Sequence, residues 1–257
     1  MTLLQQGSRD RLQVQRYASR QALGEAAAQD AATHLRQLLS QQAVVRMVFA
    51  AAPSQNEFLA ALAAAPDIDW SRIHAFHMDE YIGLANHAPQ RFSQFLRQHL
   101  FDLVQPGEVH LIPSDGDPAA ICEEYSQKLN AAPIDVVCLG IGENGHLAFN
   151  DPPVADFNDP LSVKVVELDD ACRQQQVNDG CFATFDAVPT HAVTLTLPAL
   201  LRGTRLFCMV PGATKRAAVH ATLHDDISTA CPATCLRQHP SCTLYTDSDA
   251  CPEVELD

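Results

Sequence analysis

Short apolar runs that alternate with longer helical segments are the feature that most constrains the fold of this chain. Residues 20–41 carry alanines and leucines at helical spacing, and the run 43–50 that follows has the length of a buried strand. The alternation continues with helical patterns at 56–65, 90–104 and 117–130 and apolar runs at 73–78, 108–112 and 134–140. Strands that alternate with helices imply crossover connections, so we expect an α/β fold with a mostly parallel sheet and helices on both faces.

The segment 154–187 interrupts this alternation. It is polar, carries acidic pairs and contains one apolar run, at 163–168, that favours a strand. Such a segment is typical of a flap over a site or of a long surface excursion. The α/β pattern then resumes at 191–201, 204–210, 213–223 and 242–246. Because no linker or repeat separates these parts, we expect a single domain over residues 1–257 with a possible flap at 154–187.

Composition and charge narrow the classes of partner. The chain has 257 residues, of which 47% are hydrophobic, enough for a sizeable core. A net charge of −14 with only 17 Lys and Arg argues against a nucleic-acid partner. Charges lie where a signal peptide needs its apolar region, and no stretch reaches the length of a membrane span. The nine cysteines are an odd number and fit reduced core thiols, so we expect no membrane association and a cytoplasmic location.

The strand-like run 134–140 ends in the sequence GIGENGHLAFNDPP, residues 140–153. Its glycines, Gly145 among them, allow a sharp turn and let a ligand approach the backbone. A plain tight turn does not need His146 and Asp151 so close together. A histidine beside a carboxylate is oriented by it and can shuttle protons near neutral pH, so we interpret this loop as a site.

Two adjacent acids, Asp79 and Glu80, follow the strand-like run 73–78. Ligands of open parallel sheets bind beyond the carboxyl ends of the strands, so a carboxylate at such an end is a candidate general base. Adjacent side chains point to opposite sides of an extended chain, so we expect at most one of the two to face the site directly. A pair of solvated loop acids is the alternative interpretation.

Two further strand ends suit an anionic ligand. Ser54 follows the run 43–50, where small residues and a helix start could present N–H groups, although a plain turn with an N-cap fits equally well. Lys215 follows a glycine turn and lies in the first turn of a predicted helix. A cation there is unfavourable for the helix dipole, which favours a role in binding an anion over one in stability.

Metal sites are the other chemistry we consider. Cys231, Cys235 and His239 are spaced by four and would share one helix face, but no fourth ligand is adjacent, and His74 and His77 would face opposite sides of a strand. We therefore expect no metal.

Two long motifs carry a resemblance to a known family. The segments FHMDEYIGL (76–84) and GIGENGHLAFNDPP (140–153), at the ends of successive predicted strands, resemble the signature segments of glucosamine-6-phosphate deaminases. The lysine segment PGATKRAAV and the tail ISTACPATCLRQHPSCTLYTD are similar to that family too, so the resemblance covers most of the chain. It implies a Rossmann-like α/β fold and an enzyme of carbohydrate metabolism that acts on sugar phosphates without a metal or organic cofactor.

The resemblance also implies roles for single residues. Asp79 matches the aspartate that moves a proton between C2 and C1 of the opened sugar, and His146 matches the histidine that assists ring opening. Lys215 matches a lysine that holds the substrate phosphate, and Ser54 falls near the family's phosphate loop, although AAAPSQNE lacks the usual glycine pair. Gly145 and Glu80, which flank the matched residues, are assigned to substrate binding.

The chain departs from the family at two catalytic positions. Asn144 stands where the family has an aspartate, and Asp151 stands where it has a glutamate. Asn144 can hydrogen-bond an imidazole but cannot stabilise imidazolium by charge, so the proton relay would depend on Asp151. Lys164 and Arg173 are the candidates in the flap for the family's further phosphate-binding cations.

The resemblance leads to three hypotheses. The first is deamination and isomerisation of a hexosamine 6-phosphate, such as glucosamine 6-phosphate to fructose 6-phosphate and ammonia. The second is a 6-phosphogluconolactonase-type hydrolase of the same superfamily. The third, suggested by Asn144, is a sugar-phosphate-binding protein with weak catalysis. Each has a small-molecule sugar phosphate as its ligand, and a homo-oligomer is compatible with all three, since family members occur as monomers and as oligomers.

Overall fold

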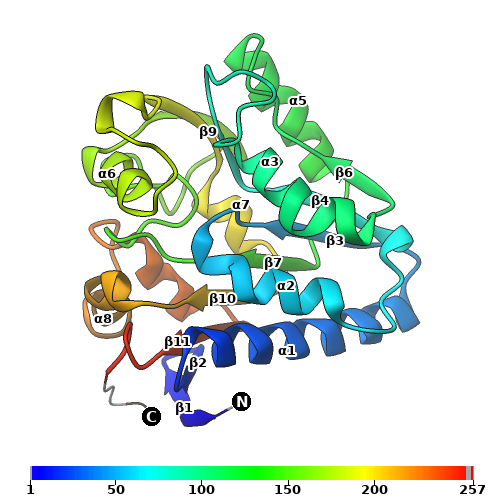
Figure 1. Cartoon of the computed structure of the whole chain (residues 1–257), viewed down its shortest axis with the longest axis vertical. Helices are drawn as coiled ribbons and strands as arrows, with labels where there is room; N and C mark the ends of the chain where they lie inside the picture. Colours follow the sequence, from blue (N-terminus) through cyan, green and yellow to red (C-terminus); the bar gives the residue numbers. More distant parts are fainter. Residues whose placement is uncertain (1, 253–255, 257) are drawn as a thin grey trace.

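One mostly parallel sheet forms the centre of the molecule, with strand order β1-β2-β11-β10-β7-β3-β4-β6 (Figure 1). The computed structural model describes residues 2–252 and 256. Its strands are β1 (Leu3–Arg9), β2 (Leu12–Tyr17), β3 (Val45–Phe49), β4 (Ile73–His77), β6 (Glu108–His110), β7 (Val136–Leu139), β10 (Arg205–Val210) and β11 (Cys242–Asp247). Only the β1–β2 pair is antiparallel among the neighbours of this sheet. The α/β fold predicted from the sequence is confirmed.

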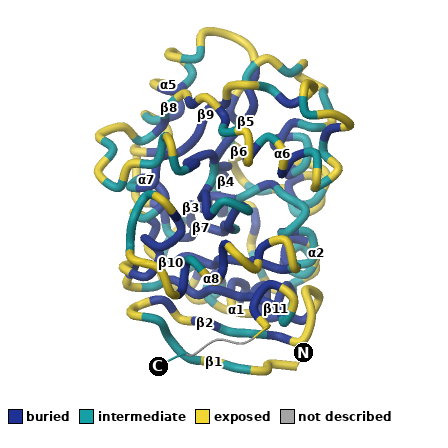
Figure 2. Tube along the Cα trace, turned by 90° about the vertical axis from the view of Figure 1, so that its left-hand side faces the viewer, coloured by how far each residue is buried: buried dark blue, intermediate teal, exposed yellow. Residues whose placement is uncertain are grey.

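Helices cover both faces of this sheet. The first face carries α1 (Arg20–Gln41), α2 (Asn56–Ala64) and α3 (Phe92–Leu96), and the second carries α5 (Pro118–Asn130), α7 (Leu197–Leu201) and α8 (Arg216–His224). Because successive strand residues face opposite sides, Met47 and Phe49 pack into the first hydrophobic cluster and Val48 into the second. Burial on both faces explains why β7 is continuously apolar and why β3 is apolar except at Arg46 (Figure 2).

The alanine-rich sequence of α1 allows it to lie close to its neighbours. Ser19 caps the helix, since its hydroxyl accepts a hydrogen bond from the amide of Ala22 at 3.2 Å. A Cβ at Gly24 would lie 2.6 Å from Cβ of Glu57, on α2, so the close approach of the two helices requires glycine at this position.

The segment after α3 is less regular than the helical pattern of 90–104 suggested. The chain passes through a π-helical turn (Arg97–Phe101) and a short α4 (Asp102–Val104), and this helical segment ends at Gln105, which has a left-handed conformation with φ of 53°.

In the described part of the chain, no helix combines the length and the apolarity that a membrane span requires.

A second, antiparallel sheet has the order β5-β9-β8, and its strands are β5 (Asp79–Tyr81), β8 (Val163–Glu167) and β9 (His191–Leu195). The segment 154–187 contains β8, which corresponds to the strand predicted at 163–168. It also contains a helix, α6 (Asp170–Asn178), that the sequence pattern does not predict. Pairing of β9 with β5 places this segment beside the carboxyl edge of the central sheet (Figure 1). The N-terminal hairpin β1–β2, which forms one edge of the central sheet, was not predicted either.

Candidate active site

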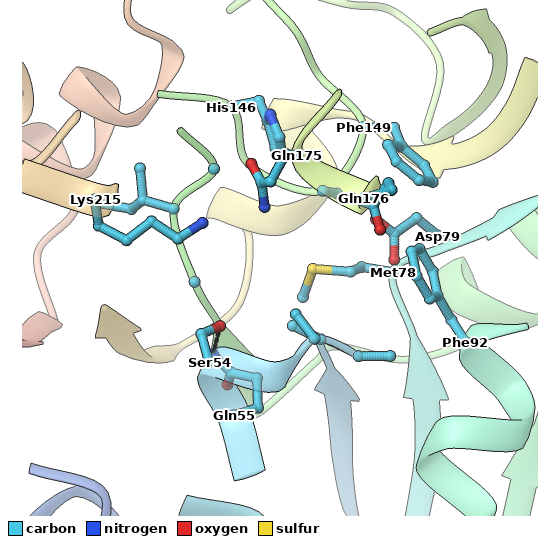
Figure 3. A pocket seen from close by; sticks show the side chains of 17 residues that line it. Ser54, Gln55, Met78, Asp79, Phe92, His146, Phe149, Gln175, Gln176 and Lys215 are labelled. Atoms are coloured by element: carbon cyan, nitrogen blue, oxygen red, sulfur yellow. Dashed lines mark hydrogen bonds between the residues drawn. The ribbon is translucent and has the colours of Figure 1, made fainter. Parts of the chain in front are cut away.

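A pocket lies beyond the carboxyl ends of β10, β7, β3 and β4, which are neighbours in the central sheet (Figure 3). This is the edge at which open α/β sheets bind ligands. Each of the four strand ends contributes one of the expected residues, which are Ser54, Asp79, His146 and Lys215. Residues up to 161 positions apart in the sequence therefore line one cavity. Phe92 from α3 and Gln175 and Gln176 from α6 also contribute to its lining.

The glycines of the His146 loop have specific packing reasons. A Cβ at Gly142 would lie 2.1–2.3 Å from three ring atoms of His146, so only glycine lets the ring rest on the backbone there. Gly145 has a φ of 83°, and a Cβ there would lie 2.6 Å from Sγ of Cys231. Gly145 does not line the pocket, and we conclude that it shapes the loop that presents His146.

The imidazole of His146 is held through one of its two nitrogens. Nδ1 lies 2.6 Å from Oδ1 of Asn144 and 3.0 Å from Oδ1 of Asp151. Nε2 has no hydrogen-bond partner among residues 2–252 and 256, and His146 lines the pocket. Nε2 is therefore the nitrogen that a bound ligand can engage.

Asp151 lies behind His146 and is fully buried. Burial by itself would raise the pKa of this carboxyl group, but its contacts with His146 and with N–H donors of Asn144 and Asp169 outweigh burial, so the pKa of Asp151 is lowered. Asp151 is thus ionised at neutral pH and can stabilise a proton on His146.

Asp79, on the opposite side of the pocket, has no contacts of the kind that stabilise the charge of Asp151. Burial raises the pKa of its carboxyl group well above the usual range, and the nearby charges of Glu80 and Asp151 raise it further. No group within the described residues donates a hydrogen bond to this carboxylate. A carboxylate with a raised pKa is a stronger base, and this is the property that abstraction of a proton from carbon requires.

Lys215 supplies the positive charge of the pocket. It ends a 3₁₀ turn (Ala213–Lys215) entered through Gly212, whose φ is 95°, and its side chain extends into the cavity (Figure 3). Burial lowers the pKa of Lys215, and the carboxylates of Asp179 and Glu143 partly offset this effect. A desolvated ammonium group favours an anionic ligand as its partner.

Ser54 lies on the wall of the pocket opposite His146 (Figure 3). It belongs to a 3₁₀ turn (Pro53–Gln55) that leads into α2, and its Oγ accepts a hydrogen bond from Nε2 of Gln55 at 3.2 Å. Pro53, the first residue of this turn, has no N–H to offer a ligand.

The structure does not bring Glu80, Lys164 and Arg173 to the pocket. Glu80 is fully buried beneath the start of α3. Nζ of Lys164 lies 2.7 Å from the carbonyl oxygen of Val154 and 2.8 Å from the carboxylate of Asp159. Arg173 donates to the carbonyl oxygens of Phe185 and Val188 and stacks on the Phe185 ring. Both cations thus bind groups within the segment 154–187 or directly after it.

Sequence reasoning missed the contribution of α6. Gln175 and Gln176 line the pocket, and Oε1 of Gln175 accepts a hydrogen bond from the amide of Glu143 at 2.8 Å. Asp169 and Cys172 reach the His146 loop from the same element. The run CRQQQV, inside the expected flap, is compatible with a helix. Because the run is polar, its composition does not indicate that one face of this helix is buried.

One cluster has the composition of a metal site. His146, Asp151 and Cys172 each offer a ligand atom, and these atoms lie within 4.8 Å of one another. Hydrogen bonds already account for Nδ1 of His146 and for both carboxylate oxygens of Asp151. Cys231, Cys235 and His239 do not form such a group within the described residues, and both ring nitrogens of His239 bind backbone groups.

A strand-end pocket with an acid, a histidine and a lysine defines an α/β enzyme whose site lies beyond the carboxyl ends of the strands of its central sheet. The family model of glucosamine-6-phosphate isomerases/6-phosphogluconolactonase matches residues 18–245. The chain belongs to this family.

Relatives and solved structures agree with this assignment. The glucosamine-6-phosphate deaminases of Bacillus cereus (strain G9842) and Bacillus thuringiensis (strain Al Hakam) are each 35% identical over 185 residues, which are 71% of this chain and 68% of theirs. A monomeric glucosamine-6-phosphate deaminase has a similar structure, with a TM-score of 0.84, 24% identity, and coverage of 92% of this chain and 98% of its own. The 6-phosphogluconolactonase of Thermotoga maritima has a TM-score of 0.74, 20% identity and coverage of 91% and 98%.

Proposed function

We propose that the protein converts a hexosamine 6-phosphate, such as glucosamine 6-phosphate, to a ketose 6-phosphate and ammonia. The single observation that carries this proposal is that Asp79, His146 and Lys215 line one pocket. A base, a proton shuttle and an anion-binding cation are the three functions that the reaction needs. The curated relatives at 35% identity are glucosamine-6-phosphate deaminases, which supports the choice of substrate.

His146 opens the sugar ring in this proposal. Its Nε2 transfers the proton of the anomeric hydroxyl to the ring oxygen, so the C1–O5 bond breaks and an aldehyde forms at C1. The charge that the imidazole gains in this transfer is balanced by Asp151, which lies 3.0 Å from Nδ1. His146 returns to its original protonation state when the step is complete.

Asp79 then interconverts the aldose and ketose forms. Its carboxylate takes the proton from C2 while the electron pair moves to O1, which gives an aminoenolate, and the protonated acid returns this proton to C1. One N–H proton passes to O1, so O1 becomes a hydroxyl and the amine at C2 becomes an imine. Water then adds to the imine carbon, and ammonia leaves to give the ketone. The raised pKa of Asp79 matches a group that must both accept and donate a proton.

Lys215 holds the phosphate in this proposal, with the hydroxyl of Ser54 and backbone amides of the neighbouring turns as further donors. In Figure 3 the ammonium group of Lys215 and Ser54 lie on one side of the cavity, and Asp79 lies on the other. This separation supports a substrate that spans the pocket with its phosphate at one end and its reacting carbons at the other.

The test is production of ammonia and fructose 6-phosphate from glucosamine 6-phosphate by the purified protein. We expect equal amounts of both products, and none above background with the Asp79→Asn variant. Absence of both products with every hexosamine 6-phosphate tried would contradict the proposal.

A 6-phosphogluconolactonase activity is the second candidate, since lactonases belong to the same family and share the fold. Lactone hydrolysis needs one base to activate water, which His146 could supply, but it abstracts no proton from carbon. Asp79→Asn should therefore leave a lactonase largely active. Lactone hydrolysis that persists in this variant, without ammonia release by the wild type, would favour this candidate.

We further infer a cytoplasmic enzyme with no nucleic-acid partner. All nine cysteines are unpaired and eight of them are buried, which suits a reducing compartment. A net charge of −14 would repel a phosphate backbone, so fluorescently labelled duplex DNA should not bind at physiological salt. Sedimentation would test for a homo-oligomer.

A further inference from the structure

Asn144 is a junction between the His146 loop and the flap. Its Nδ2 donates to Oδ1 of Asp151 and to Oδ2 of Asp169, each at 3.2 Å. Its Oδ1 accepts from the backbone amide of His146 at 3.1 Å and lies 2.6 Å from Nδ1 of the same residue. One side-chain amide therefore uses both of its ends within a partly buried network.

The chemistry of these partners fixes the orientation of the amide. If the Asn144 amide were flipped, its oxygen would face two carboxylates and its NH₂ group would face the amide hydrogen of His146. In the observed orientation an acceptor-only oxygen faces Nδ1 of His146, so Nδ1 must carry the hydrogen when the ring is neutral. The lone pair then lies on Nε2, the nitrogen that a ligand in the pocket can reach.

Asp169 reaches this network from the flap. It is the N-cap residue of α6, yet its side chain makes no capping hydrogen bond to that helix. N-cap aspartates usually accept a hydrogen bond from the first turn of their own helix, and this contact stabilises the helix. The carboxylate of Asp169 instead accepts from Asn144, and its backbone amide donates to Oδ2 of Asp151 at 3.3 Å.

We propose that Asp169 is a positioning residue that acts through Asn144, and that the two form a matched pair. Asp169 supplies from the flap the carboxylate that orients the amide of Asn144, and the amide in turn fixes the tautomer of His146. This proposal concerns the proton relay of the proposed function and rests on it for its kinetic consequence. Its structural content, the tautomer of His146, does not depend on which substrate is used.

The pairing has an unexpected consequence for position 144. An aspartate there matches the usual residue of the family and would be expected to help catalysis. In this chain it would place a third carboxylate against those of Asp151 and Asp169, at separations near 3.2 Å. Asn144→Asp should therefore lower activity, and neutralising Asp169 should recover part of the loss.

The kinetic test uses four variants: Asn144→Asp, Asp169→Asn, Asp169→Ala and the double variant Asn144→Asp/Asp169→Asn. Asp169→Ala should lower kcat roughly 10- to 100-fold, the range expected for loss of a hydrogen bond to a charged group, with KM little changed. Asp169→Asn keeps an acceptor oxygen and should lose less. Asn144→Asp should lose at least as much as Asp169→Ala, and the double variant should be more active than Asn144→Asp alone.

Asp170→Asn is the matched control, because Asp170 is the next residue and its side chain is 88% exposed. This variant should keep wild-type kinetics. Thermal melting of every variant shows whether a loss of activity reflects unfolding. A purely structural role for Asp169 would make the two substitutions additive, whereas the pairing requires Asp169→Asn to be beneficial in the Asn144→Asp background. An Asn144→Asp variant as active as wild type, or additive losses, would overturn the proposal.

A spectroscopic test separates this inference from the proposed function. Long-range ¹H–¹⁵N correlation spectra of the full chain, at a pH where the ring is neutral, report the tautomer of each histidine, and a His146→Gln variant identifies the signal of His146. We expect the Nδ1–H form in the wild type and a mixture in Asp169→Ala. The Nε2–H form in the wild type would overturn the inference, whereas the expected spectra without ammonia release would refute only the proposed reaction.

Discussion

Two regions on opposite sides of β5 contain adjacent buried carboxylates with very different surroundings. On the pocket side, Asp79 faces the cavity and no described residue donates a hydrogen bond to its carboxylate. On the helix side, Glu80 accepts hydrogen bonds from the amides of Tyr81, Phe92 and Ser93 at 3.0–3.1 Å. Nε of Arg91 lies 3.5 Å from the same carboxylate.

The difference shows how one strand separates a structural acid from a chemical one. Glu80 satisfies the amides that begin α3, and in return they favour its charged form, so it is a buried acid with a structural partner for each oxygen. Asp79 is also buried, with 7% of its surface exposed, but no described residue donates a hydrogen bond to its carboxylate, which is left for a ligand to satisfy. An unsupported buried carboxylate is unfavourable for stability, and such groups persist mainly where function requires them.

The largest effect should follow Asp79→Asn. Removal of the base should lower kcat for deamination roughly 10²- to 10⁴-fold, the usual contribution of general acid–base catalysis. The variant should also stop exchange of the substrate's C1 and C2 protons with D₂O, which NMR can follow directly. Glu80→Gln is the comparison, and it should retain most of the activity. Proton exchange that survives in Asp79→Asn would assign the base elsewhere.

Substitution of Glu80, on the helix side of β5, should lower the stability of the protein. Glu80→Ala leaves three buried amides and the cation of Arg91 without their acceptor, so the free energy of unfolding should fall by about 3–5 kcal/mol, as for other broken buried pairs. Urea unfolding followed by circular dichroism measures this change. Glu80→Gln retains one acceptor oxygen and should lose less, and Glu123→Ala, on the exposed surface of α5, should lose very little. A stable Glu80→Ala variant would refute the anchoring role.

The same contrast explains what the sequence could predict. The apolar runs predicted β3, β4, β7, β10 and β11 to within a few residues, because a strand buried on both faces leaves an unmistakable pattern. The β1–β2 hairpin was missed because its sequence, LLQQGSRDRLQVQRY, is half exposed and polar. The helix α6 was missed because its buried face consists of glutamines and a cysteine.

Site residues followed the same division. Asp79, His146 and Lys215 could be predicted because the ends of parallel strands meet at one edge, so local patterns fix their proximity. Period-two alternation predicted that Asp79 and Glu80 would not both face the cavity, but it did not say what Glu80 would bind. Asp169 follows a strand of the second sheet, β8, and contacts Asn144 across 25 residues, and no local rule specifies such a contact.

The smallest expected effect is on how the free energy of unfolding depends on pH, and it tests the comparison of Asp79 with Glu80 most directly. Burial raises the pKa of Asp79 well above its unfolded value of about 3.9, so its favourable contribution is complete below that value and is lost as pH rises through the folded pKa. Asp79→Asn lacks this loss. The variant should therefore gain stability relative to wild type as pH rises from about 4 towards neutrality, although it is inactive.

Burial also raises the pKa of Glu80, but its hydrogen bonds with Ser93 and Phe92 and the charge of Arg91 oppose the increase. The wild-type-minus-variant difference for Glu80→Gln should therefore change less with pH than that for Asp79→Asn. Urea unfolding of the three proteins between pH 4 and pH 8 gives both differences, and the titration of all other groups cancels in each. Parallel curves for wild type and Asp79→Asn would show that Asp79 is supported by contacts after all, and the distinction between the two sides of β5 would then fail.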